Sequence, residues 1–121
     1  MAYVSLDSDQ IKKANKKHKY THDQVLKLEK CMDPKTGPLY FMKEFIKIQH
    51  PTKGSMSFKP YSYQERLINS YNDHRFSIAM LPRQTGKTTC AAGYLIWYAM
   101  FIPDSQILIA AHKYAGASDI M

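Results

Sequence analysis

Apolar positions recur at helical spacing between residues 21 and 75 and gather into short continuous runs after residue 75. Thr21 and Gln24 have the spacing of a capping box, so a helix is expected to begin there. The apolar face of that helix would consist of Val25, Leu28 and Met32. The pattern therefore predicts an amphipathic helix directly after the first twenty residues.

Two more helices are predicted before residue 75. Pro38 suits the first position of a helix that is expected over residues 39–50. The inward positions of that helix are Met42, Phe45, Ile46 and Gln49. A short edge strand is expected over residues 57–59, before a helix over residues 62–72. The apolar stripe of this last helix is Tyr63, Leu67, Ile68 and Tyr71.

Two strand-length apolar runs flank a longer apolar segment in the last third. Residues 77–81 and 106–111 have the length and composition of buried strands, and the segment between them, which ends at Pro103, predicts a helix. This order predicts a parallel, right-handed βαβ unit and an α/β fold class. A parallel sheet of two strands cannot bury both of its faces. The chain is therefore expected to be the N-terminal portion of a longer protein.

Three regions are predicted along the chain. Residues 1–20 carry several lysines and few apolar residues, which is typical of a weakly structured, solvated arm; a basic arm that touches DNA or a partner subunit is the alternative. Residues 21–75 form a helical lead-in. Residues 76–121 contain the βαβ unit, which is truncated at its end.

Composition limits the choice of partner and compartment. The 121 residues include 17 Lys and Arg against 10 Asp and Glu, and a formal charge of +7 suits a nucleotide or nucleic-acid partner. Cys31 and Cys90 have no metal-ligand spacing and are expected to be reduced thiols of an intracellular protein. We expect no signal peptide, and the apolar run over residues 90–103 is too short to span a bilayer.

The segment between the apolar run and the helix carries the clearest chemistry. Residues 82–89 read PRQTGKTT, and a strand, such a loop and a helix follow one another in a Walker A phosphate loop. Gly86 lets a phosphate approach the backbone, Lys87 is suited to the β- and γ-phosphates, and the Thr88 hydroxyl is placed to bind Mg²⁺. The consensus glycine five residues before Gly86 is replaced by Leu81. The sequence therefore predicts an incomplete P-loop NTPase domain that binds ATP and Mg²⁺.

Other side chains of the loop are expected to join the site. The residues predicted to contact the nucleotide phosphates are Arg83, Gln84, Thr85, Gly86, Lys87, Thr88 and Thr89. The guanidinium of Arg83 stays charged and lies inside the loop, so it is a candidate arginine finger supplied in cis; a solvent-exposed arginine is the alternative. Arg83 and Lys87 are the predicted catalytic residues.

An aromatic and an amide side chain lie upstream of the loop. The amide of Gln64 can both donate to and accept from an adenine edge, and Tyr63 beside it can stack on the base. The alternative is that the pair has no role in binding, with one of the two residues in the core and the other on the surface of an amphipathic helix. His112 and Lys113 follow the second apolar run, where they would contact phosphate or simply be hydrated.

Hydrolysis of ATP needs a buried strand that ends in an acidic residue. None of the ten acidic residues follows an apolar run of four residues. We therefore expect this chain to bind ATP without appreciable hydrolysis, and multiple turnover of ATP by residues 1–121 alone would contradict that expectation.

The loop, with an arginine inside it and no leading glycine, closely resembles that of phage large terminase subunits, the ATPase-nucleases that package DNA into capsids. The likeness to myovirus-type members continues through residues 11–15 (IKKAN), 29–31 (EKC), 45–50 (FIKIQH), 61–64 (YSYQ) and 107–113 (ILIAAHK). The resemblance implies that Lys87 and Thr88 bind phosphate and Mg²⁺ and that Tyr63 and Gln64 form an adenine-binding motif. The family's Walker B acids, coupling motif and C-terminal nuclease have no counterpart in this sequence.

The resemblance also implies partners and a location. The full-length protein would translocate and cut double-stranded DNA, working with a small terminase subunit and the portal protein, as a homo-oligomer on the portal. It would act in the host-cell cytoplasm at the procapsid and be absent from the mature virion. No membrane partner is expected.

Three other interpretations remain open. A superfamily-two DNA helicase or translocase shares a glutamine motif before Walker A. A small-molecule kinase also has a phosphate loop but would want an arginine-rich lid after the second strand, where this chain has residues 115–118 (AGAS). A basic nucleic-acid-binding module would use the loop to grip backbone phosphate.

Overall fold

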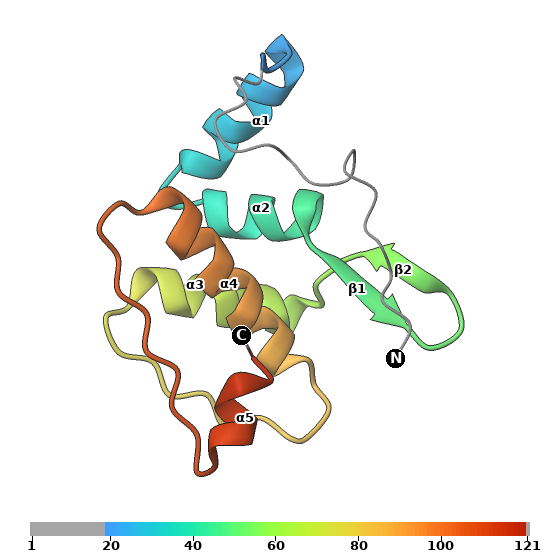
Figure 1. Ribbon diagram of the computed structural model, residues 1–121, viewed down its shortest axis with the longest axis vertical. Helices are drawn as coiled ribbons and strands as arrows, with labels where there is room; N and C mark the ends of the chain where they lie inside the picture. The colour runs from blue at the N-terminus through green and yellow to red at the C-terminus, as the bar shows by residue number, and fades with distance from the viewer. Residues whose placement is uncertain (1–18, 121) are drawn as a thin grey trace, which may run out of the picture.

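The computed structural model describes residues 19–120 and shows helices with one small sheet (Figure 1). The elements are α1 (His22–Met32), α2 (Gly37–Phe45), β1 (Lys47–His50), β2 (Gly54–Ser57), α3 (Ser62–Asp73), α4 (Lys87–Phe101) and α5 (Tyr114–Ser118). The fold is α/β only in the coarse sense that it combines helices with a two-stranded antiparallel sheet. All but the last two residues of the predicted basic arm lie outside the described part of the chain.

Helix α2 lies at the centre of the packing. It contacts α1, α3, α4 and β2, and α3 also packs against α4 (Figure 1). The buried core brings these elements together through Cys31, Phe41, Met42, Phe58, Leu67, Ile68, Cys90 and Trp97. Both cysteines are free thiols, and burial raises the pKa of each one. A raised thiol pKa favours the protonated form at neutral pH, so both side chains act as small core residues.

Helix α1 begins where the sequence predicts. The side-chain oxygen of Gln24 accepts a hydrogen bond from the Thr21 N–H at 3.0 Å, as a capping box requires. The predicted apolar face is only partly covered, because Met32 is 64% exposed. The other end of the helix is held firmly: the indole N–H of Trp97 donates to the Cys31 carbonyl at 2.8 Å. This buried bond ties the end of α1 to α4.

The prediction that the second helix extends to residue 50 is wrong. Helix α2 ends at Phe45, and Lys47–His50 instead form β1, which pairs antiparallel with β2. The physical reason is a change of period, because half-buried Ile46 and Ile48 alternate with exposed Lys47 and a two-residue period favours a strand. Gly54, at φ +71°, follows the hairpin turn. The strand expected over residues 57–59 lies slightly earlier, at Gly54–Ser57.

Helix α3 is confirmed with nearly the predicted bounds. Leu67 and Ile68 of its predicted stripe are buried, whereas Tyr63 and Tyr71 are half-buried. Tyr71 and Tyr94 face one another from α3 and α4, with ring centroids 5.7 Å apart. These contacts fix α3 against α4 and so place the start of α3 beside the loop that precedes α4.

The expected parallel sheet is not formed among residues 19–120. The predicted helix between the two apolar runs is present as α4, but residues 77–81 and 106–111 pair with no strand. Their apolar side chains are largely in solvent, with Ile78 96% and Leu108 92% exposed. A parallel pair needs cover on both faces, and within residues 19–120 the two runs are connected by α4 alone. Residues 77–81 are instead anchored at one end, where the Ser77 hydroxyl donates to the Ser70 carbonyl at 3.0 Å.

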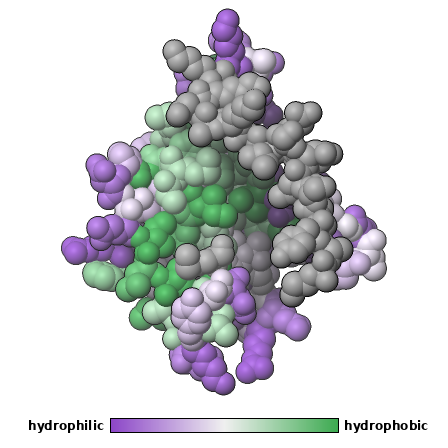
Figure 2. Space-filling model, in the orientation of Figure 1, coloured by the Kyte–Doolittle hydropathy of each residue, from purple (hydrophilic) through white to green (hydrophobic). Residues whose placement is uncertain are grey.

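The exposed apolar surface extends onto α4. Figure 2 shows apolar side chains gathered on the face where α4 lies, with hydrophilic side chains around its margin. Ile96 and Met100 of this helix are 46% and 62% exposed. Despite this apolar character, no helix in the described part of the chain is long and apolar enough to cross a membrane.

Candidate nucleotide-binding loop

The loop before α4 contains two residues in the left-handed conformation. Gly86 is the residue that caps the N-terminus of α4, and it has the left-handed conformation with φ +73°. Gln84 is also left-handed, at φ +60°, which is uncommon for a residue other than glycine. Helix α4 is 15 residues long, and its first N–H groups have no partner inside the helix. This end of α4 is therefore suited to an anion.

The lysine of the motif folds back over the loop. Lys87 is the first residue of α4, and its ammonium group donates to the Pro82 carbonyl at 3.0 Å. The Thr85 hydroxyl donates to the same carbonyl at 3.0 Å. Two donors from one end of the loop thus hold the carbonyl at its other end. The contact places a positive charge against the loop at the N-terminus of α4.

Two side chains of α3 reach the loop from the other side. The Tyr63 hydroxyl donates to the Thr85 carbonyl at 2.9 Å, and the side-chain amide of Gln64 donates to that carbonyl at 3.1 Å. The amide oxygen of Gln64 accepts from the Tyr61 N–H at 2.9 Å, which caps α3. Gln64 is only 5% exposed. Nothing in the sequence pattern indicated this bridge from the start of α3 to the loop.

The structure gathers most of the predicted site residues. Residues 83–89 form one continuous turn and the start of α4, and Tyr63 and Gln64 lie against it. The side chains of Arg83, Gln84 and Thr88 are exposed, whereas those of Thr85, Lys87 and Thr89 are half-buried. His112 and Lys113 are exposed before α5, and among the described residues no hydrogen bond or ion pair joins them to the loop.

Magnesium fits this loop only as part of a nucleotide complex. Within residues 19–120, no group of three or more His, Cys, Asp and Glu side chains could hold a metal ion. Mg²⁺ commonly keeps several waters and takes few protein ligands beside the phosphates of its substrate. The exposed Thr88 hydroxyl in the first turn of α4 suits one such ligand position.

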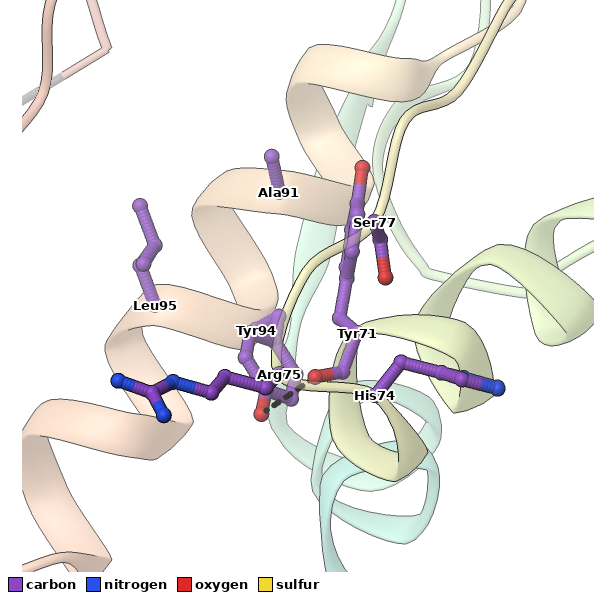
Figure 3. Close-up of a pocket in the computed structure, with 7 residues that line it drawn as sticks. All are labelled: Tyr71, His74, Arg75, Ser77, Ala91, Tyr94 and Leu95. Atoms are coloured by element: carbon purple, nitrogen blue, oxygen red, sulfur yellow. Dashed lines mark hydrogen bonds between the residues drawn. The ribbon is translucent and has the colours of Figure 1, made fainter.

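A pocket that the sequence did not predict lies at the far end of α3. It encloses about 330 Å³ between α3 and α4 (Figure 3). Its lining residues are Tyr71, His74, Arg75, Ser77, Ala91, Tyr94 and Leu95. Burial raises the pKa of the two tyrosines, and the Tyr94 hydroxyl donates to the Tyr71 carbonyl at 3.4 Å. This arrangement braces the two helices and brings no pair of catalytic groups together.

Replacing Gly86 tests whether the loop has the conformation described. A Cβ on Gly86 would lie 2.6 Å from the side-chain nitrogen of Gln64, whereas a Cβ on Gly54 would meet nothing within 4 Å. Both glycines are left-handed, at φ +73° and +71°, a conformation that costs other residues about 1–2 kcal/mol. Gly86→Ala is expected to lower the free energy of unfolding by about 1 kcal/mol more than Gly54→Ala, because it also overpacks the loop. Urea unfolding of both variants measures the difference, and equal losses would contradict the prediction.

Comparison with known families and solved structures found no match for this chain. The functional assignment therefore depends on the conformation of residues 82–89 and on the residues that carry the resemblance.

Proposed function

We propose that residues 82–89 bind the triphosphate of ATP together with Mg²⁺. The observation that carries this proposal is the left-handed Gly86 that caps the N-terminus of α4, where Lys87 lies beside the first, unpartnered N–H groups of the helix. A helix N-terminus, a glycine without a Cβ and a lysine are the components that a phosphate loop requires.

Each group in the loop has a distinct role in this proposal. The ammonium group of Lys87 leaves the Pro82 carbonyl, 3.0 Å away, and binds the β- and γ-phosphates. The Thr88 hydroxyl binds the Mg²⁺ that the nucleotide brings. Exposed Arg83 can swing over the γ-phosphate without displacing a buried group, which suits an arginine finger.

The wider proposal is that the chain is the N-terminal part of a phage large terminase subunit, a motor that packages double-stranded DNA. Its support is the ordered likeness along the chain and the formal charge of +7, which suits a polyanion. The full-length protein would supply the acidic residues for hydrolysis and work as a homo-oligomer with a small terminase subunit and the portal. Its place would be the procapsid portal in the host-cell cytoplasm.

The proposal also includes a P-loop-type parallel sheet in the complete ATPase domain. Residues 77–81 and 106–111 form no helix or strand, and most of their apolar side chains are exposed, as those of strands would be before neighbouring strands pair with them. Helix α4 connects them in the order of a βαβ unit. Further strands would cover side chains such as Ile78, Met80 and Leu108.

A helicase or translocase of superfamily two is the second candidate. The position of Gln64 ahead of the phosphate loop supports it, because that class also has a glutamine motif before Walker A. Helicase motifs in a longer form of the protein, without a nuclease domain, would select this candidate over the packaging motor.

Competition against a fluorescent ATP analogue bound to the chain tests the nucleotide site. ATP–Mg²⁺ is expected to displace the analogue, and AMP at the same concentration is not, because AMP lacks the β- and γ-phosphates that the loop would bind. Displacement by a short DNA duplex as readily as by ATP–Mg²⁺ would contradict the proposal and indicate a module that grips backbone phosphate.

A further inference from the structure

The groups expected to recognise adenine are already bonded within the protein. We propose that Tyr63 and Gln64 are positioning residues that hold the Thr85 carbonyl and so fix the phosphate loop, and that they do not read the base. This inference rests on the proposed nucleotide site. It replaces the expected role of the two residues in adenine recognition with a role in positioning the loop.

Gln64 faces the protein with both ends of its amide. Its oxygen accepts from the Tyr61 N–H at 2.9 Å, and its nitrogen donates to the Thr85 carbonyl at 3.1 Å. Reading an adenine edge requires the same oxygen and nitrogen to point together toward the base. With only 5% of the residue exposed, a base cannot reach that edge without breaking the cap of α3 and the bond to the loop.

The side chain of Tyr63 is also bonded within the protein. Its hydroxyl donates to the Thr85 carbonyl at 2.9 Å, and its ring stacks on Tyr61, with centroids 5.9 Å apart and planes 8° from parallel. One face of the Tyr63 ring is therefore covered. Tyr61 is 68% exposed, so its ring is the more accessible of the two.

Fixing one carbonyl fixes the neighbouring N–H group. The peptide bond between Thr85 and Gly86 is planar and trans, so its carbonyl and its N–H point in opposite directions. Tyr63 and Gln64 occupy both acceptor positions of the Thr85 oxygen from the α3 side. The Gly86 N–H is consequently turned away from α3. Gln64 also fills the space where a Cβ on Gly86 would lie, 2.6 Å from its side-chain nitrogen.

Two substitutions separate the loop contact from other roles of these side chains. Tyr63→Phe removes only the hydroxyl, and Tyr61→Phe removes the same atom from the neighbouring ring as a matched control. Gln64→Glu keeps an oxygen for the Tyr61 N–H, since glutamate serves equally in a capping box, but it loses the donor to Thr85.

Two-dimensional ¹⁵N–¹H spectra of the ligand-free chain test the contact directly. We expect the Gly86 cross-peak to move in Tyr63→Phe and in Gln64→Glu and to stay in place in Tyr61→Phe. The Gly54 cross-peak, from the hairpin, should stay in place in all three variants. An unchanged Gly86 cross-peak in Tyr63→Phe would overturn the inference, even if Gln64→Glu fails to fold.

Ligand titrations then distinguish positioning from base recognition. Tyr63→Phe and Gln64→Met are expected to weaken ATP–Mg²⁺, GTP–Mg²⁺ and tripolyphosphate–Mg²⁺ by one common factor, about 3- to 10-fold for a lost hydrogen bond. A loss confined to ATP–Mg²⁺ would overturn the inference in favour of adenine recognition. If none of the three ligands binds to the wild-type chain, the proposed nucleotide site fails, while the Gly86 cross-peak still decides the positioning role.

Discussion

Lys87→Ala is expected to weaken the binding of ATP–Mg²⁺ by about 100-fold, because hydrogen bonds to charged groups contribute about 1.5–3 kcal/mol each and each 1.4 kcal/mol is a factor of ten. In the ligand-free chain the ammonium group of Lys87 bonds only a neutral carbonyl, that of Pro82, among the described contacts. Exchanging that partner for the β- and γ-phosphates makes the interaction charge-assisted. Isothermal titration calorimetry with ATP–Mg²⁺ measures the change in affinity.

A second lysine provides the control for charge alone. Lys53 is exposed in the turn between β1 and β2, so Lys53→Ala removes the same positive charge from a different surface. We expect this variant to bind ATP–Mg²⁺ within about twofold of the wild type, since exposed charges are largely screened by salt. Equal losses in the two variants would mean that nucleotide is attracted by net charge and has no site at the loop.

Arg83→Ala is expected to leave ATP binding nearly intact and to lower turnover at least about 10³-fold, the lower end of the range for an arginine finger. The assay uses the longer protein of the proposed function, which is expected to supply the acidic residues for hydrolysis. Because Arg83 is exposed in the ligand-free loop, its removal should not disturb the fold. Steady-state ATPase kinetics, combined with a binding titration, separate the two effects.

Arg75 is the matched control for this experiment. It is also exposed, but it lines the pocket at the end of α3 and not the phosphate loop. Arg75→Ala should therefore leave turnover unchanged. A mild effect of Arg83→Ala, similar to that of Arg75→Ala, would assign Arg83 to the solvent-exposed surface and remove it from the catalytic machinery.

Helices could be predicted from the sequence where a capping signal and an apolar stripe agreed. The Thr21 and Gln24 pair marked the start of α1, and the stripe that includes Leu67 and Ile68 marked α3. The end of α2 was missed because residues 46–50 satisfy a helical period and a strand period at once. Pairing with β2 decided between them, and pairing is a tertiary contact that a local pattern does not contain.

Strand pairing was also the element that sequence reasoning could not supply for residues 77–81 and 106–111. Their apolar composition is that of buried strands, yet a strand exists only when another backbone accepts and donates its hydrogen bonds. In the described chain, 93% of Met80 and 92% of Leu108 remain exposed. The apolar composition of these two runs thus indicated that they are suited to be buried strands. Whether they form strands depends on another backbone that pairs with them.

Part of the candidate site could likewise be predicted from the sequence, and part could not. The turn at Gly86 and the helix beginning at Lys87 could be read from the motif, because glycine and a helix start have local signatures. The bond from Gln64 to Thr85 joins residues 21 positions apart, and no local pattern encodes it. A glutamine at the third position of a helix signals a cap, and that signal at Gln64 was the available hint that its oxygen would be occupied.

Titration of ATP–Mg²⁺ followed residue by residue is the most direct test of the central claim, that residues 82–89 form a nucleotide-binding loop. In ¹⁵N–¹H spectra, the cross-peaks of Thr85, Gly86, Lys87 and Thr88 are expected to shift along one saturable curve while the Gly54 cross-peak stays in place. Saturable shifts confined to residues outside the loop, or no saturable shift at any residue, would contradict the claim.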